Sequence, residues 1–133
     1  MIFHQNIIEL AGQNENFRQV LKTGRHSQVV LMSLLPGEDI GNEVHETVDQ
    51  ILIFVEGNGT AEFNRSESDL SDTAPEPVER VDFKAGDLVF VDAGTWHNFT
   101  NTGSNPLKLY TIYSPANHPA DRIQKNKPAV DDD

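Results

Sequence analysis

The chain has 133 residues, no cysteine and a formal net charge of −11 at pH 7. This length corresponds to one domain with a core of its own, and the absence of cysteine excludes disulfides and thiolate metal sites. The negative charge argues against a nucleic acid or an anionic membrane as partner, because either would require a basic patch. We find neither a secretory signal pattern nor the roughly 20 apolar residues that span a membrane, and we expect a cytoplasmic protein.

Short apolar segments separated by turn residues recur along the chain. Residues 1–16 fit either a short strand or a helical turn. The sequence Gly57-Asn58-Gly59 predicts a hairpin turn, and the last two strands are expected to form a hairpin. Many short strands without a long helix predict an all-β barrel. Strands are predicted at 17–23, 28–35, 51–55, 60–63, 80–84, 88–91, 97–100 and 107–113.

Two polar segments differ from this pattern. Residues 64–79 are polar and acidic with two prolines, and such a composition cannot bury enough apolar surface to order itself. We interpret this segment as a flexible insertion in a hairpin and not as a linker between domains. Residues 114–133 are expected to form an irregular tail against the barrel. The chain 1–133 is therefore interpreted as a single domain with a barrel core at about 17–114.

Two residues that can bind a metal ion precede the apolar segment 51–55. Glu43 and His45 are two positions apart, so in an extended strand their side chains would project to the same face. Gln50 begins the apolar segment. A carboxylate and an imidazole beside a buried strand are components of a metal site on a β scaffold.

A second segment, 86–101, has a similar organisation. It combines a buried-strand pattern, a turn at 93–95 and His97 at the start of the next strand. Apart from two aspartates, His97 is the residue in this segment that commonly binds metal. The two segments together predict two hairpins that meet inside one barrel.

The segment 37–59, which contains Glu43, His45 and Gln50, resembles the first motif of the cupin superfamily. This superfamily consists of small double-stranded β-helix (jelly-roll) barrels. Gly37 and Gly57 occupy the glycine positions of the motif, and His45 occupies its second histidine position. Glu43 replaces the first histidine, and Gln50 replaces the glutamate.

The second segment resembles the second cupin motif at four positions, Gly86, Gly94, His97 and Asn101. Asp92 stands where that motif has proline. Beyond the motifs, the chain is similar to small bacterial cupins described as mannose-6-phosphate isomerase-like. The resemblance implies a jelly-roll fold and a homodimer, since barrel edges commonly pair in this family.

The resemblance also implies a metal site formed by Glu43, His45, Gln50 and His97. Two imidazoles and one carboxylate on one face of an ion leave positions open for a substrate. The usual cupin set of three histidines and one glutamate carries one negative charge, and so does this set. We therefore expect one divalent ion per chain, with manganese, iron, nickel and zinc as the alternatives.

Several functions fit such a site. The first is Lewis-acid chemistry on a small oxygenated molecule such as a sugar or sugar acid, with Glu43 as the base of an isomerase. A second is an iron dioxygenase, and a third is a non-catalytic module that binds a small ligand. A barrel without metal is a further alternative, which the replacements at Glu43 and Gln50 favour. No feature of the sequence separates the isomerase from the dioxygenase.

The remaining histidines and aromatic residues carry weaker expectations. His4, His26 and His118 have no motif spacing and are expected at the surface, with His118 folded over the barrel mouth as an alternative. Trp96 is expected to pack against the barrel, and Asp92 either to cap a turn or to point at the cavity. The expected core or cavity lining comprises Met32, Phe54, Phe90, Phe99 and Tyr110.

Overall fold

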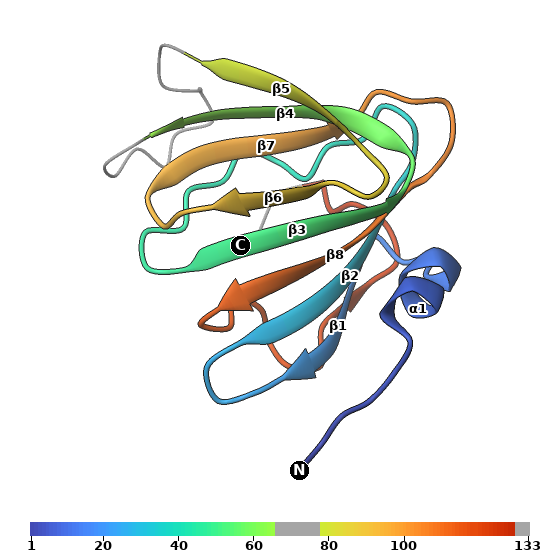
Figure 1. The fold of residues 1–133 in the computed structure, drawn as a ribbon, viewed down its shortest axis with the longest axis vertical. Coiled ribbons are helices and arrows are strands. Elements are labelled where there is room, and N and C mark those ends of the chain that lie inside the picture. Colours follow the sequence, from blue (N-terminus) through green and yellow to red (C-terminus); the bar gives the residue numbers. More distant parts are fainter. Residues whose placement is uncertain (66–77, 130–133) are drawn as a thin grey trace.

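The computed structural model describes residues 1–65 and 78–129, and of Arg65 only the backbone. Most of the expected insertion 64–79 and the last four residues of the expected tail therefore lie outside the described residues. One short helix and nine strands form the described part (Figure 1). They are α1 (Ile7–Gln13), β1 (Arg18–Thr23), β2 (Gln28–Leu34), β3 (Asp49–Glu56), β4 (Asn58–Arg65), β5 (Glu79–Lys84), β6 (Leu88–Val91), β7 (Thr95–Asn101), β8 (Leu107–Ser114) and β9 (Ile123–Gln124).

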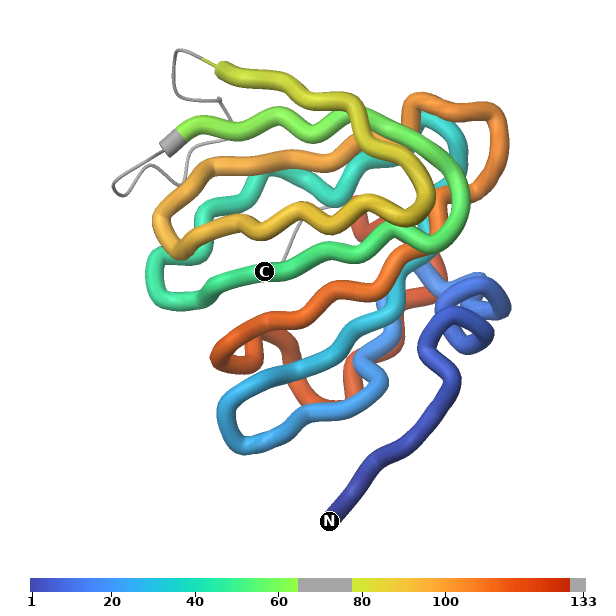
Figure 2. Tube along the Cα trace, in the orientation of Figure 1, coloured from blue at the N-terminus to red at the C-terminus, as the bar shows by residue number. Residues whose placement is uncertain are grey.

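The strands form two antiparallel sheets, which confirms the predicted all-β class. Six strands form one sheet in the order β6-β3-β8-β2-β1-β9, and three form the other in the order β5-β4-β7. The path of the chain in Figure 2 passes repeatedly between the two sheets. Neighbours in a sheet are therefore mostly distant in sequence, as in a jelly roll.

Four of the connections are corners between sheets and not hairpins. β3 and β4 flank Gly57 but belong to different sheets, so the predicted hairpin at 57–59 is wrong. The predicted last hairpin is also wrong, because β7 and β8 lie in different sheets, and the same holds for the hairpins expected to carry the two motifs. Turn residues mark where a chain bends, but strand pairing depends on partners that are distant in sequence.

Gly57 shows why a corner needs this residue. Its φ is 94°, a conformation that side chains rarely adopt. A Cβ atom there would lie 3.1 Å from Leu107 Cα and 3.2 Å from the Pro106 carbonyl oxygen. The glycine therefore lets the chain leave β3 close to the start of β8.

The helix α1 resolves the ambiguity of the first 16 residues. Asn6 caps it by accepting a hydrogen bond of 3.0 Å from the Glu9 backbone N–H. Just after the helix, the Asn14 carbonyl accepts a hydrogen bond from the buried Lys108 side chain of β8. Within the described ranges, no helix has the length and apolar character needed to cross a membrane.

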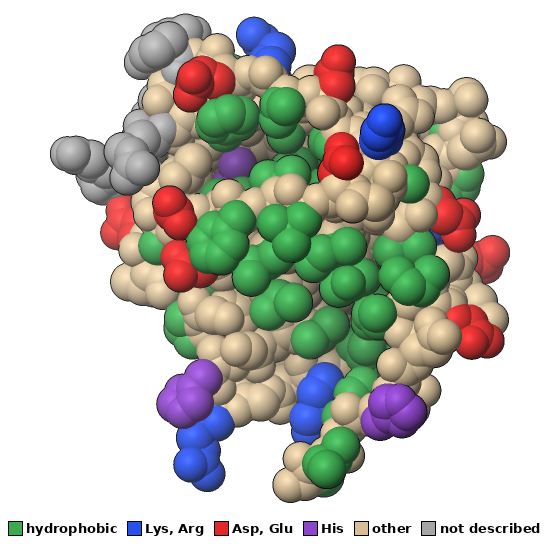
Figure 3. All heavy atoms as spheres, viewed as in Figure 1, with side chains coloured by type: hydrophobic (Ala, Val, Ile, Leu, Met, Phe, Trp, Pro, Cys, Tyr) green, Lys and Arg blue, Asp and Glu red, His purple; other side chains and the backbone are tan. Residues whose placement is uncertain are grey.

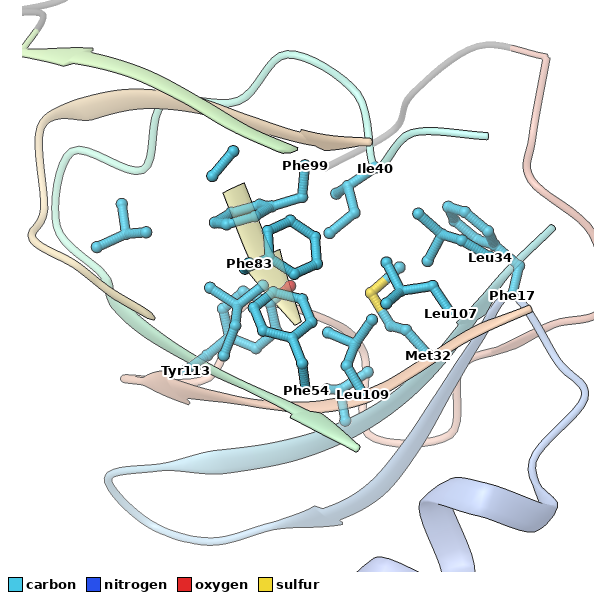
Figure 4. Close-up of a cluster of buried hydrophobic side chains, with 14 of the residues drawn as sticks. Phe17, Met32, Leu34, Ile40, Phe54, Phe83, Phe99, Leu107, Leu109 and Tyr113 are labelled. Atoms are coloured by element: carbon cyan, nitrogen blue, oxygen red, sulfur yellow. The ribbon is translucent and has the colours of Figure 1, made fainter. Parts of the chain in front are cut away.

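The core lies between the sheets and changes character along the barrel. Phe54 of the larger sheet stacks on Phe83 of the smaller one, with ring centroids 3.8 Å apart. In Figure 4, Leu34 and Leu107 lie at one end of the apolar cluster and Tyr113 at the other. Beyond the Tyr113 end, the interior becomes polar, and this is where the predicted site residues meet.

Candidate metal centre

Glu43 is positioned by a short backbone pairing with β7. The N–H of each of Glu43 and His97 donates to the carbonyl of the other, both at 3.0 Å. This pairing is an isolated bridge and not part of a named strand. The carbonyl of His45 accepts a hydrogen bond from the Gly94 N–H at 2.8 Å. The two motif segments are thus joined directly, and their side chains point into the same interior space.

Three of the four predicted ligands converge. Glu43 Oε1 lies 3.7 Å from His97 Nε2 and 3.9 Å from His45 Nε2. The candidate ligand atoms of the three residues all lie within 4.8 Å of one another. Each residue is at most 9% exposed. Two imidazoles and one carboxylate in this arrangement fit a metal-binding site.

The hydrogen bonding of the cluster is incomplete in a way that a cation would correct. Within the described ranges, both carboxylate oxygens of Glu43 and Nε2 of His45 are buried without a hydrogen-bond partner. A buried carboxylate with no partner costs several kcal/mol or changes its protonation. A divalent ion bound between these atoms would satisfy all three, so the donor set fits the metal that the sequence implies.

Gln50, the fourth predicted ligand, faces the same point. Its amide N–H group donates to Thr111 Oγ1 at 3.1 Å and to Tyr113 Oη at 3.2 Å. These hydrogen bonds turn Oε1 toward Nε2 of His97, 3.1 Å away. Because the Thr95 carbonyl can only accept, it receives the proton on His97 Nδ1 at 2.9 Å.

In a neutral His97 ring, Nε2 is therefore an acceptor that faces a second acceptor, Gln50 Oε1. Two acceptors at 3.1 Å repel each other unless the ring is protonated or a cation lies beside both. A cation held beside both atoms would replace this repulsion with attraction to both lone pairs. This geometry therefore favours Gln50 as a neutral oxygen ligand. The bond from His97 Nδ1–H to a backbone carbonyl is also typical of metal-binding histidines.

Burial keeps His45 ready to bind. Burial is the main cause that lowers the pKa of His45 below its ordinary value, and the Glu43 carboxylate opposes this effect. Electrostatic interactions with His97 and with the Arg18 guanidinium lower the pKa further. The imidazole is therefore neutral at pH 7, and its Nε2 lone pair is available to a metal ion.

Residues that support the ligands were missed in the sequence. Thr111 and Tyr113 are fully buried and hold the amide of Gln50. Both follow the inward alternation of β8, in which Leu107 and Leu109 also face the core. The alternation of these polar residues with the leucines could have indicated their inward position. That inference would have required knowing which face of the strand is internal.

His118 contradicts its expected place at the surface, since it is 6% exposed. The side chain of Gln28 accepts from the His118 backbone N–H at 3.0 Å and donates to its carbonyl at 2.7 Å. The ring lies 3.4 Å from Tyr113 Oη, measured from Nε2. Burial, with the positive charge of Arg18 as the next cause, lowers the pKa of His118 to about 4. His118 belongs to an irregular segment, where no periodicity indicates burial.

A cavity of ≈ 340 Å³ adjoins the cluster through His97. Figure 3 shows a histidine side chain at the base of this hollow, between hydrophobic side chains. The described lining contains carboxylates and no lysine or arginine. It comprises Ala61, Glu62, Phe63, Glu79, Val81, Val89, Phe90, Val91, Asp92, Thr95, His97 and Phe99.

The weaker expectations have mixed outcomes. Trp96 is buried as expected, and His4 and His26 are exposed as expected. Asp92 lines the cavity, which was one of its two alternatives. Phe90 lines the cavity but is also 53% exposed on the outside of the barrel.

Two facing antiparallel sheets with an internal Glu-His-His cluster define a double-stranded β-helix protein with a candidate metal centre. The family model described as "Cupin domain" matches residues 30–113 of the chain. The chain therefore belongs to the cupin family. The sequence resemblance to cupins is thereby confirmed.

Known proteins similar to this chain include one solved structure with high overall likeness. BH2720 from Bacillus halodurans is 40% identical with a TM-score of 0.83, covering 96% of this chain and 91% of that one. YrkC of Bacillus subtilis, an uncharacterized protein, is 45% identical over 94% of this chain, which spans 63% of YrkC. An oxalate-binding protein of Thermotoga maritima is 28% identical, covering 76% of this chain and 75% of that protein.

Proposed function

We propose that this cupin binds one divalent metal ion and acts on a small oxygenated molecule. The observation that carries the proposal is the convergence of buried ligand atoms of Glu43 and His45 that have no hydrogen-bond partner within the described ranges. His97 and Gln50 present two further acceptor atoms to the same point. The similarity to an oxalate-binding protein supports a ligand with oxygen donors.

The first candidate reaction is the isomerisation of a sugar or sugar acid. A bound divalent ion would supply Lewis-acid polarisation of a carbonyl or hydroxyl group. Glu43, if released from the metal, would take a proton from the hydroxyl-bearing carbon next to the carbonyl and return it to the carbonyl carbon. The hydroxyl proton would move to the carbonyl oxygen, so that no oxidant or reductant is needed. Its burial beside two imidazoles keeps water away from that carboxylate.

The lining of the cavity beside His97 restricts the class of ligand that can bind there. Its walls are mainly apolar, and Glu62, Glu79 and Asp92 add negative charge. Like charges repel in such an enclosed space, so the lining favours an uncharged sugar over a sugar acid or a phosphorylated sugar. Among the described lining residues there is no lysine or arginine to attract an anion.

The first test is metal content. Protein purified without a metal-affinity tag should carry about one ion per chain by elemental analysis, and His45→Ala and His97→Ala should each lose most of it. His26→Ala is the matched control, because His26 is exposed. Unchanged metal content in both cluster variants would refute the site.

The second part of the test distinguishes the reactions. Metal-loaded protein in D₂O with uncharged sugars or sugar acids should exchange the hydrogen next to the carbonyl for deuterium, as followed by proton NMR. The Glu43→Gln variant should lose this exchange while it keeps an oxygen ligand. Oxygen consumption without such exchange would instead indicate a dioxygenase, and ligand binding without either would indicate a binding module.

A further inference from the structure

Three fully buried polar side chains lie in one row on the larger sheet: Gln28 of β2, Tyr113 of β8 and Gln50 of β3. The strand register sets this row, because Tyr113 pairs with Gln28 on one side and with Gln50 on the other. Buried polar groups are stable only where they are hydrogen-bonded. Gln50 belongs to the candidate metal centre, whereas the proposed function assigns no role to Gln28 or to the segment after β8.

Gln28 fixes the segment after β8 beside this row. Its Oε1 accepts from the backbone N–H groups of Asn117 and His118 at 3.1 and 3.0 Å, and its Nε2 donates to the His118 carbonyl at 2.7 Å. The His118 ring then packs edge-on against Tyr113, with ring centroids 5.2 Å apart and an interplanar angle of 76°. In this position His118 Nε2 lies 3.4 Å from Tyr113 Oη.

The hydrogen bonds between His118 and Gln50 have a defined direction. The side-chain Nδ2 of Asn117 lies 3.4 Å from His118 Nε2, and an amide nitrogen can only donate, so Nε2 of the neutral ring is an acceptor. Burial favours the neutral ring, since it lowers the pKa of His118 to about 4. Tyr113 Oη accepts from Gln50 Nε2 at 3.2 Å and can donate its own proton to His118. The chain of donors therefore runs from the Gln50 amide through the Tyr113 hydroxyl to His118.

The opposite orientation of the Gln50 amide would obstruct the centre. A flipped amide would donate from Nε2 to Nε2 of His97 and occupy the lone pair that a metal ion needs. The hydroxyl groups of Thr111 and Tyr113 do not prevent this flip by themselves, because a hydroxyl can donate as readily as it can accept. His118 opposes the flip, since an acceptor that holds the Tyr113 proton makes that hydroxyl an acceptor toward Gln50.

We propose that His118 is a positioning residue for the metal centre, and that through Tyr113 it keeps Oε1 of Gln50 directed at the point where the ion would bind. The effect on metal binding rests on the proposed function, whereas the orientation of the amide does not need a metal. His118 lies outside both motif segments, 37–59 and 86–101. The irregular segment after β8 would thus influence the centre without supplying a ligand.

The first test uses NMR on the metal-free full chain. Long-range proton–nitrogen spectra should show the Nδ1–H tautomer for His118, with Nε2 unprotonated. With isotope-labelled glutamine, the Gln50 amide protons should give NOEs to the Tyr113 ring in wild type. In His118→Phe, which removes the acceptor, they should instead give NOEs to Hε1 of His97. An Nε2–H tautomer in wild type, or an unchanged NOE pattern in the variant, would overturn the proposal.

The second test measures Co²⁺ affinity through the visible absorption of the bound ion. His118→Phe should weaken binding by about tenfold and change the shape of the absorption band, because loss of a group that orients a ligand typically costs 10–100-fold in metal affinity. Tyr113→Phe should have a similar effect. The double variant should bind no more weakly than Tyr113→Phe alone, since both changes interrupt the same chain of hydrogen bonds.

Two further variants separate positioning from a general loss of packing. His118→Gln, whose amide oxygen can still accept from Tyr113, should retain most of the affinity. Asn117→Ala is the matched control, because it changes the same segment and leaves His118 in place. Circular dichroism checks that each variant is folded, and Tyr113→Phe tests the same chain if His118→Phe does not fold.

The outcomes distinguish this proposal from the proposed function. Unchanged Co²⁺ binding in both single variants, or losses that add in the double variant, would overturn the role of His118. Lower stability with an unchanged absorption band would show that His118 is only structural, which also overturns it. If the wild-type protein binds no Co²⁺, the proposed function fails, and the NMR test still decides how the Gln50 amide is oriented.

Discussion

At the scale of single residues, hydrogen-bond capacity determines what the centre can hold. Glu43 and His45 present buried acceptor atoms that find no donor within the described ranges. His97 donates its Nδ1 proton to the Thr95 carbonyl. The amide N–H group of Gln50 donates to Thr111 and Tyr113. Every remaining atom that faces the common point is an acceptor. Such a set binds a cation and not another acceptor.

His118 gives a prediction at this scale. Its pKa of about 4 in the folded protein lies below the ordinary value of 6.5, so between these pH values the unfolded chain binds a proton that the folded chain does not. The free energy of unfolding should therefore fall as the pH drops from 6.5 to 4, with His118 contributing a loss on the order of 3 kcal/mol.

Urea unfolding of wild type and His118→Gln, measured at several pH values, checks this contribution. Glutamine is neutral throughout, so the variant should lose less stability than wild type across the window. His26→Gln, at an exposed position, should behave like wild type. Equal losses in wild type and His118→Gln would contradict the assigned pKa.

At the scale of elements, the corners between sheets decide the topology. Gly37 and Gly57 both have positive φ, 86° and 94°. An added Cβ atom meets nothing within 4 Å at Gly37, whereas at Gly57 it meets the backbone of Pro106 and Leu107. Comparison of the two glycines therefore distinguishes the cost of the left-handed backbone conformation alone from the added cost of steric overlap.

Replacement of each glycine by alanine should show this difference. Gly37→Ala should cost about 1–2 kcal/mol of unfolding free energy, from the left-handed conformation alone. Gly57→Ala should cost about 3 kcal/mol or more, because the start of β8 must also shift. Chemical denaturation at one pH and one protein concentration measures both. A cost at Gly57 no larger than that at Gly37 would contradict the tight corner.

At the scale of the whole molecule, the candidate centre joins segments that are distant in sequence. The ligands come from residues 43–45, from β3 and from β7, and their supports come from β8. An ion bound there would link both sheets, and it would bind the folded chain far better than the unfolded one. Metal binding and global stability should therefore be coupled.

Thermal unfolding with and without added metal measures this coupling. Free metal at 100 times its dissociation constant should stabilise the fold by about 2.7 kcal/mol, or roughly 10 °C in melting temperature for a chain of this size. His45→Ala should lose most of this shift, and His26→Ala should keep it. Protein concentration must be the same throughout, because any self-association would also make the melting temperature depend on concentration. An equal shift in wild type and His45→Ala would place the bound metal elsewhere.

Much of the fold class and the candidate ligand set could be predicted from the sequence. Short apolar segments between turn residues indicated an all-β barrel, and the positions of Glu43, His45, Gln50 and His97 relative to the motif glycines indicated one site. These features depend on local chemistry and spacing. The topology at Gly57 and the burial of His118 could not be predicted this way, because both depend on contacts with distant parts of the chain.

The sequence by itself determined which chemical groups are available: two imidazoles, a carboxylate and an amide at cupin spacing, in a chain without cysteine. Only the tertiary structure decided how these groups face one another, with buried acceptor atoms of Glu43, His45 and Gln50 directed at a common point beside His97. It also showed that the apolar residues of β3 alternate between the buried core and the half-buried opposite side of the sheet. The physical reason is that residue type sets what a group can bind, whereas burial and partners follow from how the sheets pack.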